Sequence, residues 1–329
     1  MKQKHTHDTL ALFYGLPKIH KPNVSLRPIV AHKGIPNYNL AKWMYRKLKF
    51  LQGNSTTLVQ SASRFLEDLR GQTIQTDEIM VSFDVTSLFL HKRLEEAYEE
   101  TRSPLKIKHI MRFFEFCQTT YFTFVGEAYE QIRGTPMDSP ISDLVAELGL
   151  QELENTAFNQ YKPVFWRRYV DDTFVTIEKS MLQNFHKLLN GIFPDIQFTR
   201  EEEKEQRLPL LDVLVKITPK GEIETTVYRK ATNTTQLSFQ SNYPVVHKRS
   251  CVKTLFKRIH IHCNMPEEKV REARYPRDQF MRNSYLKVFI NRCPLARPRR
   301  TQTEEPPRIW HALPYIKGVL EATERIAAG

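Results

Sequence analysis

Hydrophobic positions along the chain follow two spacings, one typical of helices and one typical of strands. Helical spacing predicts helices over residues 37–52, 62–69, 94–101, 107–120, 141–158 and 182–192. Runs of β-branched, aromatic and aliphatic residues predict strands over residues 79–89, 165–177, 196–199, 208–217 and 225–229, and a hairpin over 121–129 that turns at Gly126-Glu127. A charged turn is expected over 201–207. The mixture predicts an α+β fold.

One strand pattern, Phe165–Ile177, is interrupted by two adjacent carboxylates, Asp171 and Asp172. Because Asp favours turns over strands, the stretch predicts a β-hairpin with Asp171-Asp172 at its tip. Two carboxylates in one turn repel each other, and the hard divalent cations that relieve such repulsion prefer carboxylate oxygen. The alternative is a solvated acidic turn.

A third acid, Asp84, interrupts the buried-strand pattern of residues 79–89. A strand acid and a hairpin acid pair, separated by helices, suit a ferredoxin-like palm in which neighbouring strands bring the carboxylates together. Three such acids can hold two divalent ions about 3.5–4 Å apart, the arrangement that polymerases use for in-line phosphoryl transfer.

The charge of the chain is concentrated near one end. The 329 residues carry 49 Lys and Arg against 37 Asp and Glu, a net charge of +12. Residues 228–300 alone hold 17 basic and 4 acidic side chains, so the remainder is about neutral. This asymmetry indicates a polyanionic partner, with nucleic acid the expected one. The alternative is a basic surface that serves only solubility.

Beyond Pro244 the pattern is that of an amphipathic basic helix. Its apolar face is formed by Val252, Leu255, Phe256 and Ile259. Lys253, Lys257 and Arg258 lie off that face, where they can follow a phosphate backbone.

Extended segments joined by a turn are expected over residues 12–30, where prolines separate short apolar runs. Lys18, Lys21 and Arg27 put three cations on this piece, and cations held on a strand pair can clamp a triphosphate. The alternative is solvent-exposed charge on a strand edge.

Cysteine spacing and hydropathy bear on the compartment. Cys117, Cys251, Cys263 and Cys293 form no C-x-x-C pair, which is typical of reduced thiols. We find no apolar run of membrane-spanning length and no signal peptide. A nuclear or cytoplasmic protein without a membrane partner is expected.

With these three acids and their flanking residues, the chain resembles a reverse transcriptase. Tyr169-Val170-Asp171-Asp172 resembles that family's catalytic hairpin, and Phe83-Asp84 resembles its first metal-binding strand. The resemblance implies that Asp84, Asp171 and Asp172 bind two Mg²⁺ ions, with a backbone carbonyl of Val85 as a further ligand and Mn²⁺ as an alternative ion.

The resemblance also implies nucleotide and primer contacts. Lys18 and Arg27 match the finger cations that hold the incoming dNTP, and Phe89 matches the bulky residue that excludes a ribose 2′-hydroxyl. The segment from Gly134 to Ser139-Pro140 is similar to the nucleotide-positioning loop and helix. Leu210-Leu211-Asp212 stands where a primer-gripping hairpin follows, so Leu211 and Asp212 are expected to contact nucleic acid.

The finer resemblance is to Penelope-like retroelement reverse transcriptases, a group related to telomerase, over roughly residues 12–300. It is carried by the runs 15–21, 134–137, 166–172, 227–230 and 241–244. Elements of this family usually continue into a GIY-YIG endonuclease. Residues 313–318 resemble the approach to it, and both that domain and the family's N-terminal extension are expected to be absent here.

One departure concerns the nucleotide loop. Asp138 stands where the family pattern has Gly before Ser-Pro. Gly permits close backbone approach to the nucleotide, whereas Asp adds bulk and negative charge. The segment after Phe89, His91-Lys92-Arg93, is also atypical.

These observations predict a right-hand polymerase with interleaved fingers and palm over residues 1–217, a basic and mainly helical thumb over 218–293, and a linker over 294–329. The expected reaction is RNA-directed DNA synthesis, in which dNTPs are added to a DNA primer on an RNA template. The alternative is a catalytically impaired, truncated element copy that only binds nucleic acid.

Overall fold

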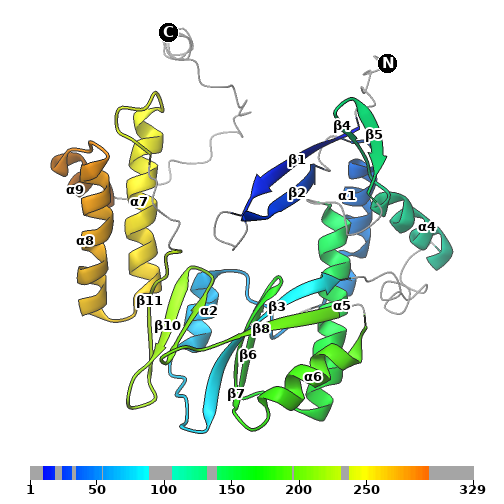
Figure 1. Cartoon of the computed structure of the whole chain (residues 1–329), viewed down its shortest axis with the longest axis horizontal. Coiled ribbons are helices and arrows are strands. Elements are labelled where there is room, and N and C mark those ends of the chain that lie inside the picture. Colours follow the sequence, from blue (N-terminus) through cyan, green and yellow to red (C-terminus); the bar gives the residue numbers. More distant parts are fainter. Residues whose placement is uncertain are drawn as a thin grey trace, which may run out of the picture. The chain divides into compact units, whose positions relative to one another are not determined.

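The computed structural model describes residues 10–18, 24–31, 35–53, 55–88, 106–131, 139–194, 196–230 and 237–295 (Figure 1). The chain forms two compact units whose segments alternate along the sequence between residues 211 and 224. The first comprises Met1–Leu211 and Lys216–Ile223, and the second comprises Asp212–Val215 and Glu224–Gly329. The chain therefore passes between the units three times, after Leu211, Val215 and Ile223.

An antiparallel sheet is central to the first unit, with strand order β6-β7-β3-β8. Its strands are β3 (Glu78–Leu88), β6 (Phe165–Tyr169), β7 (Asp172–Glu178) and β8 (Ile196–Glu202). Residues 173–177 of β7 are all buried, so both faces of this strand are covered. Consecutive side chains point to opposite faces of a sheet, and this is why β7 reads as a continuous apolar run interrupted only by threonines.

Helices cover the two faces of this sheet. Among the described residues, this unit has the helices α1 (Pro36–Leu48), the 3₁₀ helix η2 (Lys49–Gln52), α2 (Ala62–Leu69), α4 (Ile107–Gln118), α5 (Pro140–Gln160) and α6 (Leu182–Ile192). Val175 and Ile177 belong to a core shared with α1, α4, α5 and α6. On the other face, Phe174 makes an edge contact with Phe65 of α2 at 5.3 Å between ring centroids.

A second sheet in this unit has strand order β2-β1-β4-β5. It contains β1 (Ala11–Pro17), β2 (Leu26–Ala31), β4 (Tyr121–Phe124) and β5 (Glu127–Glu130). The expected extended segments over residues 12–30 are confirmed as the antiparallel pair β1–β2, and β1 pairs with β4 in parallel. Phe13 stacks on Phe122, which in turn stacks on Tyr129.

The second unit is mainly helical. It contains α7 (Val245–His262), α8 (Pro266–Arg282) and α9 (Lys287–Leu295). Its core includes Val252, Phe256 and Ile259, so the apolar face expected on the basic helix is confirmed. A three-stranded sheet, in the order β11-β10-β9, is formed where the segments of the two units alternate along the sequence. Its strands are β9 (Arg207–Leu210), β10 (Val213–Ile217) and β11 (Ile223–Val227).

The structure confirms the α+β class and corrects several boundaries. The single strand expected over 208–217 was wrong, since Leu211 and Asp212 form a turn with φ of 48° and 65° between β9 and β10. β8 extends to Glu202, inside the expected charged turn. The hairpin at residues 121–130 turns at Val125-Gly126, one residue earlier than expected. The helix expected over 94–101 lies outside the described residues.

No helix among the described residues is long and apolar enough to cross a bilayer. Cys117, Cys251, Cys263 and Cys293 are all free thiols.

Candidate active site

The acidic hairpin has its turn one residue earlier than the sequence predicted. Tyr169 pairs with Asp172 in the β6–β7 ladder, so Val170 and Asp171 form the two-residue turn and Asp172 is the first residue of β7. The expectation of Asp171-Asp172 at the tip was therefore wrong for Asp172. Val170 has φ of 55°, a left-handed conformation that is a genuine outlier for a β-branched residue.

The third acid lies directly opposite this hairpin. Asp84 of β3 and Asp172 of β7 are register partners in the antiparallel pair. Opposite residues in such a pair have Cβ atoms about 4.5–5.5 Å apart, and Asp171 is the next residue in the chain. The sheet therefore places Asp84 beside the start of β7, where Asp171 and Asp172 lie.

These carboxylates are accessible, since Asp84 and Asp171 are exposed and Asp172 is half-buried. Carboxylate oxygens are the donors that hard divalent ions prefer, so the donor chemistry fits Mg²⁺. However, the described residues contain no group of three or more His, Cys, Asp or Glu side chains close enough together to hold a metal ion. The backbone register aligns the three acids, but their side chains do not form a ready-made cluster.

Val85, the expected carbonyl ligand, lies beside an irregularity in β3. Val85 is paired with Phe198 of β8, and the register then shifts between Val85 and Ser87. Such bulges bend a strand and are frequent next to active sites. The bulge comes directly after Asp84 and Val85, where β3 leaves its regular pairing.

An ionic cluster that the sequence did not reveal lies beneath the hairpin. Arg168, in β6, is 1% exposed. Its Nη1 and Nη2 atoms donate to the two carboxylate oxygens of Glu147 at 2.7 and 2.9 Å, and its Nε donates to Glu154 at 2.8 Å. We call Arg168, Glu147 and Glu154 the Arg168 cluster.

The two carboxylates of the Arg168 cluster also accept hydrogen bonds from residues outside the cluster. Glu154 also accepts hydrogen bonds from Trp166 Nε1 and from the Thr57 hydroxyl. Glu147 accepts a further bond from Gln151. Burial by itself would lower the pKa of Arg168, but the hydrogen bond and charge of Glu147 and the charge of Glu154 hold that pKa above its ordinary value.

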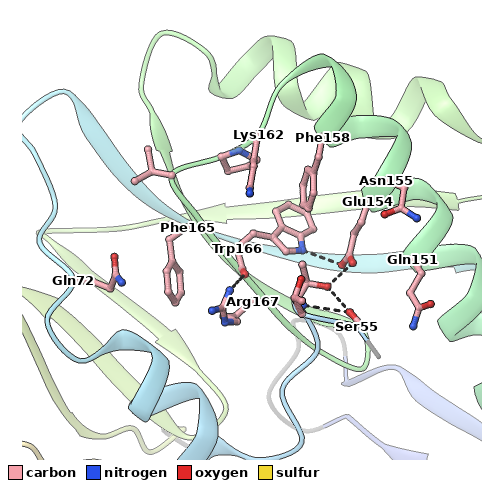
Figure 2. A pocket seen from close by; sticks show the side chains of 14 residues that line it. Ser55, Gln72, Gln151, Glu154, Asn155, Phe158, Lys162, Phe165, Trp166 and Arg167 are labelled. Atoms are coloured by element: carbon pink, nitrogen blue, oxygen red, sulfur yellow. Dashed lines mark hydrogen bonds between the residues drawn. The ribbon is translucent and has the colours of Figure 1, made fainter. Parts of the chain in front are cut away.

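A cavity of about 590 Å³ borders this cluster (Figure 2). It is lined by residues of the segment before α2, of α5 and of β6, including Ser55, Gln151, Glu154 and Trp166. The view shows the Glu154 carboxylate between the Trp166 indole and the segment of Ser55. Glu154 thus lines the cavity while it also holds Arg168.

The residues expected to bind dNTP lie on different elements. Lys18 follows β1, where its backbone N–H donates to the Ser25 carbonyl at 2.8 Å. Arg27 lies exposed in β2, opposite Leu16. Ser139 precedes α5 and is 1% exposed, and its hydroxyl has no hydrogen-bond partner among the residues that the structure describes.

Pro140 is the first residue of α5, a position that suits proline because its missing N–H is not needed there. Phe89, Gly134 and Asp138 lie outside the described residues.

The residues expected to bind nucleic acid differ in how available they are. Lys253 and Lys257 are exposed on α7. Arg258 is instead held within its own unit, where Nη2 lies 3.0 Å from the Asp212 carboxylate and 3.3 Å from the Tyr228 carbonyl. Leu211 and Asp212 form the turn between β9 and β10.

A buried histidine, His262, lies close to Arg258 and Asp212. His262 is 8% exposed, and within the described part of the chain its Nδ1 atom has no hydrogen-bond partner. Burial first, and the charge of Arg258 second, lower the pKa of His262 from its ordinary value of 6.5, with an opposing effect from Asp212.

Part of the second unit matches a family of known sequence. Residues 235–294, which contain α7, α8 and all but the last residue of α9, match the Animal helix-turn-helix domain. This match covers a minor part of the 329 residues. None of the curated proteins matches the chain.

Two solved polymerase structures are similar to the chain as a whole. Telomerase from Candida albicans, in complex with a TWJ fragment of telomeric RNA, is 14% identical over 89% of this chain and 56% of that chain, with a TM-score of 0.50. The Sicinivirus 3Dpol RNA-dependent RNA polymerase is 9% identical over 88% of this chain and 69% of that chain, with a TM-score of 0.50. The chain thus has the α+β right-hand polymerase fold and spans little more than half of the telomerase chain.

Proposed function

We propose that the chain is an RNA-directed DNA polymerase of the Penelope-like retroelement type, which adds dNTPs to a primer 3′-end. The observation that carries the proposal is the register pairing of Asp84 with Asp172, with Asp171 in the adjoining turn, within a polymerase fold. Fold alone does not assign chemistry, and these three acids supply the chemical argument. The telomerase that shares the fold is complexed with RNA, which supports RNA as the template.

The residues of the chain have separate roles in this proposal. Asp84, Asp171 and Asp172, with a carbonyl of Val85, would hold two Mg²⁺ ions. When bound, these ions supply charge stabilisation for the attacking 3′-oxygen and the departing pyrophosphate. The acids orient the reacting groups and do not themselves need to take up a proton.

The remaining site residues bind and select the nucleotide. Lys18 and Arg27 neutralise the triphosphate, and Ser139-Pro140 at the start of α5, together with the loop of Gly134, orients it. Phe89 excludes a ribose 2′-hydroxyl. Residues 1–217 serve as fingers and palm, and residues 218–293 serve as a thumb whose exposed Lys253 and Lys257 follow the primer–template backbone.

The second candidate is a protein that binds nucleic acid without synthesis. The match of residues 235–294 to a helix-turn-helix domain and the exposed lysines of α7 favour this candidate. Asp138 adds to it, because a carboxylate about 6 Å from a triphosphate charge costs roughly 3 kcal/mol at an effective dielectric of 20.

A primer-extension assay separates the two candidates. The full chain is incubated with poly(rA)/oligo(dT), dTTP and Mg²⁺, and then with Mn²⁺ in place of Mg²⁺. Extension supports the polymerase. If the wild-type chain and Asp138→Gly both bind the duplex but neither extends the primer, the second candidate is supported.

A further inference from the structure

We infer that Arg168 is a positioning residue: clamped by Glu147 and Glu154, it holds the Val170-Asp171 turn so that Asp171 and Asp172 face Asp84. The inference rests on the proposed function for its catalytic consequence and on the Arg168 cluster for its geometry.

An arginine in the middle of a core is not explained by stability. Removing a guanidinium and two carboxylates from water is costly, and replacing such a buried ionic group by apolar residues is often neutral or stabilising. Arg168 is 1% exposed, and the Glu147 and Glu154 side chains are 7% and 5% exposed. Because apolar residues at these positions would cost no folding free energy, we attribute to the cluster a role in orienting its neighbours.

The cluster is connected directly to the turn. Arg168 Nη1 donates to Glu147 and also lies 3.2 Å from the carbonyl oxygen of Val170. Val170 is the turn residue with φ of 55°, a conformation that persists only where the surroundings impose it. The guanidinium therefore holds the carbonyl of the strained residue itself.

Arg168 is held by contacts on two sides. Glu147 and Glu154 are seven residues apart on α5, which places them two turns apart on one helix face. On the other side, the backbone of Arg168 pairs with the segment before α2: its N–H donates to the Thr57 carbonyl at 2.9 Å, and its carbonyl accepts from Val59 N–H at 2.8 Å. β6 is thus fixed through both side chain and backbone two residues before the turn.

The adjacent residue, Arg167, provides a control for substitutions of Arg168. Arg167 forms its own ion pair, with Nε 2.6 Å from the Asp68 carboxylate of α2. Its guanidinium also donates to the Trp166 carbonyl, so its bonds run toward α2 and β6 and away from the turn. Arg168→Lys and Arg167→Lys each remove a guanidinium that binds a carboxylate and a backbone carbonyl, but only Arg168 bonds to a carbonyl of the turn. We therefore expect Arg168→Lys alone to loosen the turn.

The test compares Arg168→Lys and Arg167→Lys in the full chain. For Arg168→Lys we expect kcat for primer extension to fall about 100-fold, the effect of misplacing reacting groups by about 1 Å, with the KM for dTTP and the affinity for primer–template unchanged. Mn²⁺ binding without substrates, followed by electron paramagnetic resonance of the free ion, should weaken. Hydrogen exchange in the peptide spanning residues 165–176 should quicken. Arg167→Lys should match the wild type in all five quantities.

The outcomes separate a positioning role from a structural one. If Arg168→Lys only lowers the melting temperature and keeps wild-type kcat, Mn²⁺ affinity and exchange, the inference is overturned. If Arg168→Lys does not fold, Glu147→Gln, which keeps the shape of the acceptor, is judged by the same criteria. The exchange and Mn²⁺ measurements need no catalysis, so they decide the inference even if the wild type extends no primer, a result that would count against the proposed function alone.

Discussion

Asp84 and Asp172 are opposite each other in the β3–β7 ladder, and their pairing is the last one of that ladder, at the start of β7. Any side chain at one of these positions therefore lies within reach of the other. Two carboxylates so arranged repel unless a cation lies between them.

The acids give the first prediction. Asp171→Asn keeps the shape of the side chain and removes an anionic ligand, so primer extension should fall by at least ~100-fold, which corresponds to ~2.7 kcal/mol in the barrier. Asp77→Asn is the matched control, because exposed Asp77 precedes β3 at the end opposite Asp84. Equal extension by Asp171→Asn and the wild type would remove the basis of the two-metal proposal.

The second prediction concerns Val170. Glycine adopts positive φ without the penalty of about 1–2 kcal/mol that other residues carry there, so Val170→Gly should raise the free energy of unfolding by about 1 kcal/mol. Extension should nonetheless slow, because glycine lets the turn leave the geometry that presents Asp171.

Val125 provides the control for this substitution, since it is also a valine with positive φ, at 52°, in a hairpin turn. Val125→Gly should stabilise the chain similarly in chemical denaturation and leave extension unchanged. Faster extension by Val170→Gly would show that the strained turn does not serve the site.

The exposed lysines of α7 give the third prediction. If Lys253 and Lys257 contact phosphates, replacing both by Ala should lower the slope of log affinity against log salt by about 2. Arg258→Ala should leave that slope unchanged, because Arg258 is occupied by Asp212 and Tyr228. Fluorescence anisotropy with a labelled duplex over a salt series measures both, and a slope that depends on Arg258 would contradict the assignment.

His262 gives a pH-dependent prediction. Its pKa is lowered in the folded chain by burial, so between the folded pKa and the unfolded value of about 6.5 the unfolded chain binds more protons. The contribution of neutral His262 to the free energy of unfolding is therefore complete above pH 6.5 and falls as the pH drops toward the folded pKa. Hydrogen exchange in α7 peptides, corrected for intrinsic rates, should quicken from pH 7.5 to 5.5. His262→Gln should reduce this change, whereas substitution of exposed His260 by Gln should not.

Two glycines form a matched pair for the fifth prediction. Gly71 and Gly221 both have positive φ, at 77° and 80°, but a Cβ on Gly221 would lie 2.6 Å from the Ile74 carbonyl oxygen, while a Cβ on Gly71 meets nothing within 4 Å. Gly71→Ala should cost about 1–2 kcal/mol of unfolding free energy from strain alone. Gly221→Ala should cost more in urea denaturation, because it also disturbs the 2.8 Å bond from Ile74 N–H to the Gly221 carbonyl. Equal costs would mean that the backbone there moves aside freely.

Much of the fold followed from periodicity in the sequence. The helices over 62–69 and 182–192 have the predicted bounds, because the spacing of their apolar residues is regular. The acid hairpin was recognised from aromatic and β-branched runs around Asp171-Asp172. These signals are local, and the elements they specify depend little on the rest of the chain.

Turn positions and the Arg168 cluster were not predictable in this way. Val170, Leu211 and Asp212 adopt positive φ without the Gly or Asn that usually marks such turns, so tertiary contacts determine where the chain reverses. Arg168 lies in a strand, where a charged side chain is normally expected at the surface. Its partners Glu147 and Glu154 come from a distant helix, and only the folded chain brings the three together.

The three passages of the chain between its two units have a practical meaning for protein dissection. A fragment that starts at Glu224 lacks Asp212–Val215, and with them the carboxylate that faces Arg258 and the carbonyl that accepts the Tyr228 N–H. No single cut can release the helical unit intact. A stand-alone version would have to supply Asp212–Val215 as a separate peptide or through circular permutation.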